Sequence, residues 1–136
     1  METTEKRAQM ADGSEIVLKV PSVGKDLDRL VEFFLSLPKQ LRNYLRYDVT
    51  DAEICKKRLE QMDQMNHFRL IAELNGEIVG ECSLDRGPFG WTRHVAQVRT
   101  VVSPQVHGRG IELIILTHLV ELGAEVGVER FFTEVL

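Results

Sequence analysis

The stretch QVHGRGIEL, residues 105–113, determines how the rest of the chain is interpreted. Gly108 and Gly110 stand one residue apart, after a segment rich in β-branched residues and before a run of apolar helix formers. We therefore expect a tight turn from a strand into a helix. The unpaired N–H groups of such a helix's first turn, together with the positive end of its dipole, favour an anion such as phosphate. A turn whose glycines serve only packing explains these two residues equally well.

Two common phosphate-binding motifs are disfavoured by the residues that follow the turn. A dinucleotide fingerprint requires a third glycine where Leu113 stands, and it requires a strand outside an antiparallel meander. A nucleoside-triphosphate loop requires Lys and then Ser or Thr after its second glycine, where this chain has Ile111 and Glu112. The surroundings of the turn must therefore decide its ligand.

The sequence predicts strands at residues 14–20, 68–74, 77–84, 94–102 and 130–136. Asn75-Gly76 separates the second from the third, and this dipeptide is the strongest short signal for a β-hairpin. The second, third and fourth strands therefore form an antiparallel meander. The last strand must run parallel to the fourth, since a right-handed helical crossover joins them.

Helices are predicted after Ser22, from Pro38 to Tyr47, across 52–62 and across 110–127. Ser22 is the expected N-cap of the first helix. Thr50, with Glu53 three residues later, is the expected capping box of the third. The order β, α, α, α, β, β, β, α, β is that of an α/β domain with a mixed sheet.

Composition limits the class of protein. The chain has 136 residues, of which 43% are hydrophobic and 28% charged, with a net charge of −4, which fits one globular domain and argues against a nucleic-acid partner. No apolar run approaches a membrane span, so we expect a cytoplasmic protein without a membrane partner. Cys55 and Cys82 form no CxxC pair and are expected to be buried thiols.

The hexapeptide Gln105 to Gly110 matches the Q/R-x-x-G-x-G/A signature of the GCN5-related N-acetyltransferases (GNATs), between the strand and the helix where that family carries it. The resemblance covers nearly the whole chain from residue 12. It implies an α/β, mostly antiparallel mixed sheet flanked by helices, with residues 12–136 as the domain and 1–11 as a flexible tail. The stretches 33–49 and 90–104 most resemble bacterial acetyltransferase domains related to those fused to acyl-CoA synthetases.

The resemblance also implies acetyl-CoA as cosubstrate and no metal. In this family the pantetheine arm pairs with the strand before the loop, here Thr100, Val101 and Val102. The pyrophosphate would be held by Gly108, Arg109, Gly110, Ile111, Glu112 and Leu113. Glu112 departs from the small residue that many members have, and an acidic side chain beside a pyrophosphate is repulsive unless it points into water.

Acetyl transfer to a primary amine, of a protein lysine or a small molecule, requires a base, an oxyanion donor and an acid. By resemblance, Glu134 is the first candidate for the base, and Glu81 is the second by its place in the sheet. The backbone amide near Val101 or Val102 is the candidate oxyanion donor. His67, His94 and His118 show no metal-binding spacing, and His107, which lies in the loop, is interpreted as an anion contact or a surface residue.

The family's final helix and hairpin have no counterpart before Leu136, so we expect a C-terminally truncated domain whose general acid would lie beyond that residue. The apolar strand at 130–136 would then form a sheet edge, through which a homodimer is expected. A non-catalytic CoA-binding or interaction module is the alternative function. Nothing in the sequence identifies the acceptor amine.

Overall fold

The computed structural model describes residues 5–39, 51–61, 66–87 and 90–133. It contains one six-stranded sheet in the order β1-β2-β3-β4-β5-β6. All neighbouring strands are antiparallel except β5 and β6, which are parallel, as the crossover predicted. The strands are β1 Lys6–Gln9, β2 Glu15–Lys19, β3 His67–Leu74, β4 Glu77–Arg86, β5 Val95–Val102 and β6 Arg130–Phe132. The predicted fold class is confirmed.

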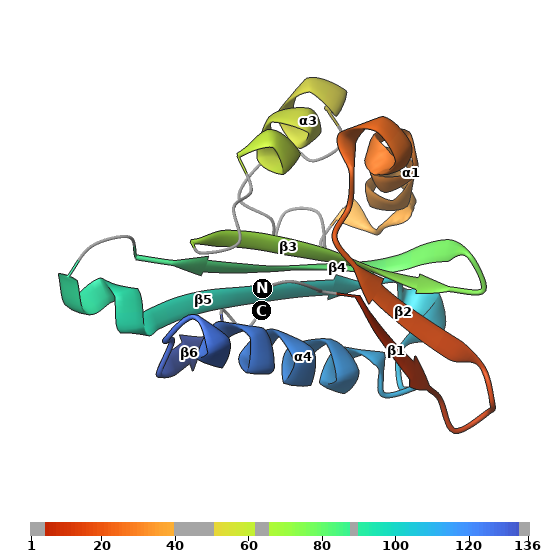
Figure 1. Cartoon of the computed structure of the whole chain (residues 1–136). Coiled ribbons are helices and arrows are strands. Elements are labelled where there is room, and N and C mark those ends of the chain that lie inside the picture. The colour runs from red at the N-terminus through yellow and green to blue at the C-terminus, as the bar shows by residue number, and fades with distance from the viewer. Residues whose placement is uncertain (1–4, 40–50, 62–65, 88–89, 134–136) are drawn as a thin grey trace.

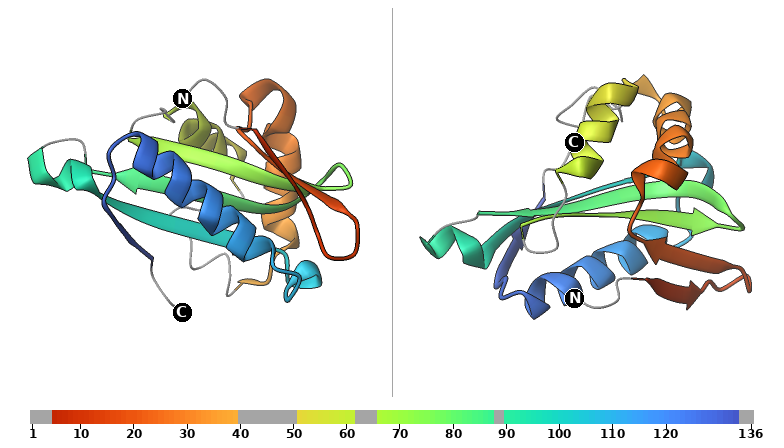
Figure 2. Two further views of the ribbon diagram at one scale, coloured as in Figure 1. Left: turned by 60° about the horizontal axis from the view of Figure 1, so that its bottom comes forward. Right: turned by 45° about the horizontal axis from the view of Figure 1, so that its top comes forward.

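Helices cover both faces of the sheet (Figures 1 and 2). On one face lie α1 and α3, and on the other lies α4. Two short 3-10 helices, η1 and η2, precede and follow β5. None of the described helices is long and apolar enough to cross a membrane. The bounds are α1 Val23–Ser36, α3 Ala52–Glu60, η1 Gly90–His94, η2 Pro104–Val106 and α4 Ile111–Glu125.

The helix starts follow local capping chemistry. Ser22 caps α1 as predicted, because its hydroxyl accepts from the Lys25 N–H at 3.2 Å. The prediction of Thr50 as the cap of α3 is wrong, since the carboxylate of Asp51 accepts from the N–H groups of the two residues that follow Ala52. The helix predicted at 38–47 lies mostly outside the described residues.

Side chains alternate between two cores, one on each face of the sheet. The α4 face holds the larger core, in which Leu70, Val98 and Ile115 are fully or almost fully buried. The smaller core on the other face joins α1 and α3 to Ile71 and Val101. Both cysteines are buried, as predicted, and burial raises the pKa of the Cys55 thiol to about 11.

The N-terminal segment differs from the expected tail. Lys6–Gln9 form β1, which pairs with β2 in the register Lys6↔Leu18. The segment KRAQ is polar and has no strand pattern, so its structure comes from the unpaired edge that β2 offers. A turn at Gly13, with φ of 89°, reverses the chain between the two strands.

The Asn75-Gly76 hairpin forms as predicted. Both residues have positive φ, 54° and 82°, which is the type I′ turn that suits a two-residue hairpin. The register shifts between Ala72 and Glu73, because Ala72 lies opposite Gly80 whereas Glu73 lies opposite Ile78. This bulge leaves one extra residue on β4 and sets which side chains of β3 and β4 share a face.

Candidate functional site

The loop after β5 adopts a backbone that suits glycine at two places. Gly108 and Gly110 have φ of 80° and 82°, in the left-handed region that other residues rarely adopt. A Cβ built at either position would meet no atom within 4 Å, so neither glycine is there to relieve crowding. Gly123 in α4 is different, since its Cβ would lie 2.6 Å from the ring of Phe131. The loop glycines therefore face open space that a ligand can approach.

The first turn of α4 presents backbone N–H groups to this space. Gly110 is the N-cap and has no side chain to accept from them, and no cap hydrogen bond is formed. Free N–H groups and the helix dipole together bind anions. The predicted pyrophosphate contacts at Ile111, Glu112 and Leu113 fall on this turn, with the Leu113 side chain 71% exposed.

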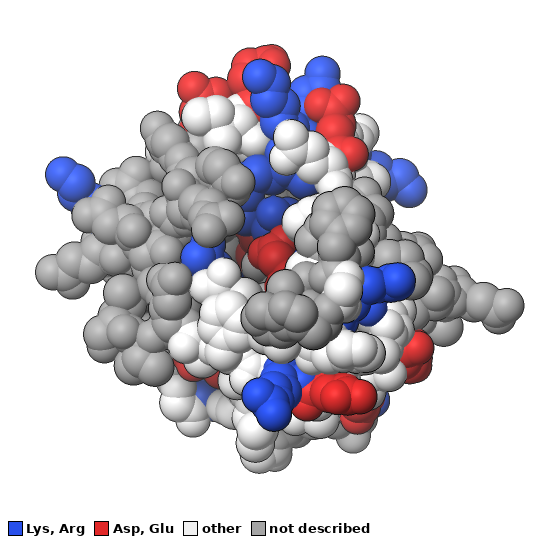
Figure 3. Space-filling view, turned by 90° about the vertical axis from the view of Figure 1, so that its left-hand side faces the viewer, with Lys and Arg blue, Asp and Glu red and all other residues white. Residues whose placement is uncertain are grey.

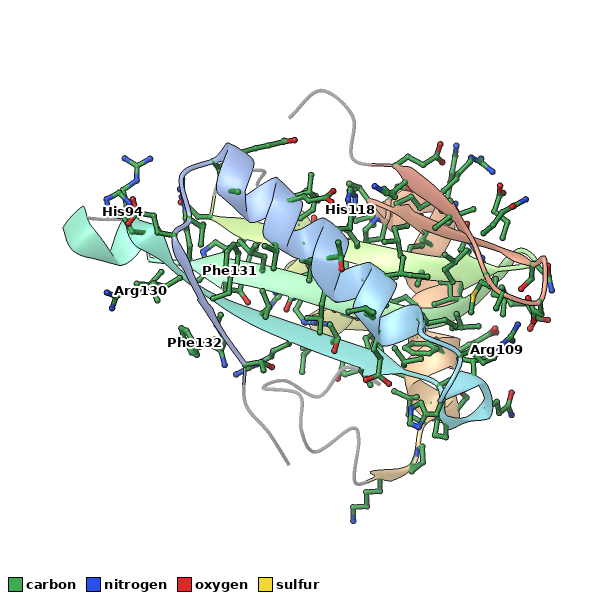
Figure 4. The ribbon with its side chains drawn as sticks, turned by 90° about the horizontal axis from the view of Figure 1, so that it is seen from below. His94, Arg109, His118, Arg130, Phe131 and Phe132 are labelled. Atoms are coloured by element: carbon green, nitrogen blue, oxygen red, sulfur yellow. The ribbon has the colours of Figure 1, made fainter. Side chains whose placement is uncertain are left out.

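The side chain of Arg109, in the loop, is held by its neighbours. Arg109 donates to the carboxylate of Asp12, and to the hydroxyl of Ser14 at 3.2 Å, in the turn between β1 and β2 (Figure 4). Hydrogen bonds from Ser14 and the Arg109 charge lower the pKa of the exposed Asp12 carboxyl to about 2. The Arg109 guanidinium is thus tied to the N-terminal hairpin.

Glu112, the residue that departs from the family pattern, does not close the loop to anions. Its side chain is 57% exposed, and its carboxylate lies 4.0 Å from His107 Nε2. His107 Nε2 in turn donates to the Val102 carbonyl at 2.9 Å. The acidic group is therefore largely in water, where its repulsion of a phosphate is screened.

The edge of β5 is open next to this loop. β6 pairs with β5 only at Val95, Ala96 and Gln97, and no other described strand pairs with that edge. The N–H of Ser103 donates to the Val79 carbonyl at 2.8 Å. This bond determines which residues of β5 direct their backbone N–H and C=O groups toward β4 and which direct them toward the open edge. By that alternation the polar backbone groups of Val101 face β4.

The backbone groups of Thr100 and Val102 accordingly face the open edge. They lie where the pantetheine contacts were predicted. The oxyanion donor was predicted at Val101 or Val102, and of these two amides that of Val102 faces the open edge whereas that of Val101 faces β4.

A pocket of about 470 Å³ opens on the face of the sheet that carries α1 and α3 (Figure 3). Its floor comes from β3, β4 and β5, and one wall comes from α3 and the residue after it. The pocket reaches Thr100 and Val101, so it meets the open edge of β5. It is lined by Arg58, Gln61, His67, Arg69, Glu81, Ser83, Asp85, Gln97, Arg99, Thr100 and Val101.

A helix N-terminus capped by glycine, an open strand edge and a pocket meeting that edge thus follow one another. The sequence matches the family described as Acetyltransferase (GNAT) family over residues 30–136. The chain belongs to this family. Members of the GNAT family use acyl-CoA as the acyl donor.

Solved structures have the same GNAT fold. The GNAT domain of S. lividans PAT is 26% identical, with a TM-score of 0.84, over 98% of this chain and 79% of that one. A GNAT acetyltransferase from Streptococcus pneumoniae is 20% identical, with a TM-score of 0.69, over 87% and 73%. An aminoglycoside acetyltransferase from an uncultured soil metagenomic sample, in complex with sisomicin, is 18% identical, with a TM-score of 0.66, over 89% and 78%. No curated protein sequence matches this GNAT chain.

Glu81, the second candidate for the base, lies in the pocket of this GNAT domain but is already bound. Its side chain is 3% exposed, and its two oxygens accept from Arg58 at 2.9 and 3.5 Å. Arg69 adds a third contact at 3.9 Å. Burial opposes the charge of Arg58, but the Glu81 carboxylate outweighs burial and raises the guanidinium's pKa. Both oxygens of the Glu81 carboxylate are therefore already engaged in an ion pair.

The first candidate for the base, Glu134, lies outside the described residues. Among the described residues, no three His, Cys, Asp or Glu side chains are grouped to hold a metal ion. His94 and His118 lie away from the pocket, close to Glu129 and Glu121 respectively.

The arginines of the pocket were missed at the sequence level. Arg58, Arg69 and Arg99 all line it. A usable signal exists in the strands, because residues 67, 69, 81, 83, 85, 97 and 99 are polar and alternate with the apolar residues of the α4 core. That alternation marks a polar face on three adjacent strands, which a functional pocket requires.

Proposed function

We propose that this GNAT domain transfers the acetyl group of acetyl-CoA to a primary amine. The observation that carries the proposal is the meeting of two sites at Thr100. On one side, the open edge of β5 leads to the glycine loop. On the other side, the polar pocket reaches the same residue. A thioester bound along the edge would therefore face an amine bound in the pocket.

The chain's backbone supplies the contacts for acetyl-CoA. The pyrophosphate fits the N–H groups from Gly108 to Leu113, because the two glycines of the loop have no side chain that would block its approach. The pantetheine arm fits the outward groups of Thr100 and Val102, as an added strand would. His107 occupies the Val102 carbonyl, so its ring must turn away if the arm pairs there.

The reaction requires a neutral amine nitrogen. Its lone pair attacks the thioester carbonyl, a C–N bond forms, and negative charge moves to the carbonyl oxygen, to which the Val102 N–H would donate. The C–S bond then breaks and CoA leaves as a thiolate. The nitrogen gives up its proton to a base, for which Glu134 is our first candidate and Glu81 our second.

A non-catalytic acyl-CoA-binding module is the second candidate function. The observation that favours it is the state of Glu81, whose two oxygens are both engaged by Arg58. In such a module the loop would bind CoA and the pocket would bind a partner group without proton transfer.

Coenzyme A release from acetyl-CoA, measured with a panel of primary amines, separates the two functions. Amine-dependent release supports transfer. Thermal stabilisation by CoA with no amine-dependent release supports the binding module. Absence of stabilisation at CoA concentrations far above a millimolar would reject both.

A further inference from the structure

The middle of the pocket floor carries a row of three polar side chains. Arg69 on β3 lies directly opposite Ser83 on β4, and Ser83 lies directly opposite Arg99 on β5. Opposite residues on one face of a sheet have Cβ atoms about 4.5–5.5 Å apart. Two guanidinium groups therefore share one row with a hydroxyl group between them. Arg69 and Ser83 are 9% and 3% exposed, so this row is built into the floor.

The described lining of the pocket has an excess of positive charge. Three arginines, Arg58, Arg69 and Arg99, face two carboxylates, Glu81 and Asp85, a difference of one positive charge with the imidazole counted as neutral. Both carboxylates have partners, since Glu81 contacts two arginines and Asp85 lies 3.0 Å from His67. Charges in a partly buried pocket interact more strongly than in water. The charge balance of the described lining residues therefore favours an incoming anion over an incoming cation.

Building on the proposed function, we propose that the acceptor is a small amine that carries its own carboxylate, as an amino acid does. The carboxylate would bind the Arg69–Ser83–Arg99 row, where planar guanidinium groups and a hydroxyl suit its two oxygens. Arg99 lies on β5 next to Thr100, so a carboxylate on this row leaves the amine a few atoms away, at the open edge.

The same charge excess helps the chemistry. A nearby positive charge disfavours the ammonium form of the acceptor, and only the neutral amine is a nucleophile. The arginines therefore assist in removing the proton, which lowers the demand on a base. A cationic polyamine would gain neither effect, because its second ammonium would face the guanidinium row.

The proposal is tested with acceptors that differ in charge and little else. The first set is 3-aminopropanoate, propylamine and 1,3-diaminopropane, and the second set is their six-carbon homologues. The measurement is kcat/KM for CoA release at constant ionic strength. We expect kcat/KM for the amino acid to exceed kcat/KM for the diamine by roughly tenfold or more in at least one set. The carboxylate of the amino acid gains a charged hydrogen bond from the row, whereas the second ammonium group of the diamine is repelled by it. Equal values for the three acceptors in both sets would overturn the proposal.

Arg99→Gln is the main variant, because Arg99 is only half-buried and its loss is tolerated better than that of the buried Arg69. The preference for amino acid over diamine should fall toward one in Arg99→Gln. Arg7→Gln is the matched control, since it removes the same charge from exposed β1 and should keep the preference. A preference that survives Arg99→Gln unchanged would assign the anion site elsewhere and reject this row.

Failure of the proposed function can be told apart from failure of this inference. If no amine is acetylated, calorimetry with N-acetyl-3-aminopropanoate and N-acetylpropylamine tests the pocket without turnover. Binding of the first compound only, lost in Arg99→Gln, supports the anion row while rejecting acetyl transfer. Equal binding of both compounds, or binding of neither, rejects the row.

Discussion

The two halves of the candidate site offer different groups to a ligand: backbone groups on one side and side chains on the other. On the cofactor side, the glycine loop and the open edge of β5 offer backbone groups, because the two loop glycines have no side chain and the side chains of Val102 and Ile111 are buried in the core. On the acceptor side, the pocket offers charged side chains from three strands and a helix, held by ion pairs such as Arg58–Glu81. Backbone groups bind what every member of a family shares, whereas side chains can change without changing the fold. The difference therefore explains why the donor can be inferred more readily than the acceptor.

The largest expected effect comes from a substitution in the glycine loop, on the cofactor side of the site. Gly110→Glu should abolish detectable CoA binding, because it places a carboxylate at the phosphate site and forces a left-handed φ of 82° on a residue with a Cβ. Calorimetric titration with CoA measures it. Gly76→Glu is the matched control, since Gly76 has the same φ of 82° and open surroundings but lies in the β3–β4 turn. A Gly110→Glu protein with the parent's affinity would refute the phosphate loop.

The second prediction concerns the Arg58–Glu81 ion pair, on the acceptor side of the site. Arg58→Met should lower the free energy of unfolding by about 3 kcal/mol, because it leaves the buried Glu81 carboxylate, among the described residues, with the 3.9 Å contact to Arg69 as its remaining ion pair. The double variant Arg58→Met/Glu81→Gln should recover at least about 1 kcal/mol, since the stranded charge is gone. Urea unfolding of the parent, the two single variants and the double variant gives these values. Additive losses would show that the pair is not coupled.

The same contrast governs what the sequence predicts. The turn into a helix at Gly110 was predicted correctly because its signals are local: a glycine, a helix start and a preceding strand. The row of Arg69, Ser83 and Arg99 depends on register between strands. From the Asn75-Gly76 turn alone, Arg69 would pair with Cys82, on the apolar face, and only the bulge near Gly80 moves it opposite Ser83. The sequence marks that bulge only indirectly, through Gly80 inside the strand and through the polar residues 69, 81 and 83, which share one face only in the bulged register.

Similar reasons explain the other differences from expectation. β1 forms from the polar segment Lys6–Gln9 because β2 offers a free edge, which is a property of the folded sheet. Asp51 replaces Thr50 as the helix cap because adjacent residues compete for one position, and helix ends are uncertain by one or two residues. The Val101 amide faces β4 because alternation along β5 is set by its partner.

The third prediction concerns the first candidate for the base. Glu134→Gln should lower kcat by roughly a hundredfold and leave CoA affinity nearly unchanged, if Glu134 removes the proton from the amine. Steady-state kinetics with a saturating amine, together with CoA titration, measures both quantities. Glu81→Gln, which alters the pocket's ion pair, is the comparison variant. Equal turnover of Glu134→Gln and the parent would assign the proton to water or to Glu81.

The smallest expected effect concerns a side chain that touches the backbone half. Asp12→Asn removes the carboxylate that holds Arg109 against the β1–β2 turn. The released guanidinium can then turn toward a bound phosphate, so CoA affinity should rise, by roughly twofold to fivefold at low salt, as for an exposed ion pair. The gain should shrink as salt is added. Asp28→Asn, which removes an exposed carboxylate from α1, is the control and should leave the affinity as it is.

The same pair has a defined pH dependence. The folded-state pKa of Asp12 is about 2, below its ordinary value of 3.8, so the ionised form stabilises the folded chain. That contribution is fully present above about pH 4 and is lost as the pH falls toward 2. The difference in unfolding midpoint between the parent and Asp12→Asn should therefore be constant at neutral pH and shrink between pH 4 and pH 2, whereas Asp28→Asn should show no such change in that window. A difference that grows as the pH falls would mean that Asp12 is not held by Ser14 and Arg109 in solution, and that the loop's arginine is free.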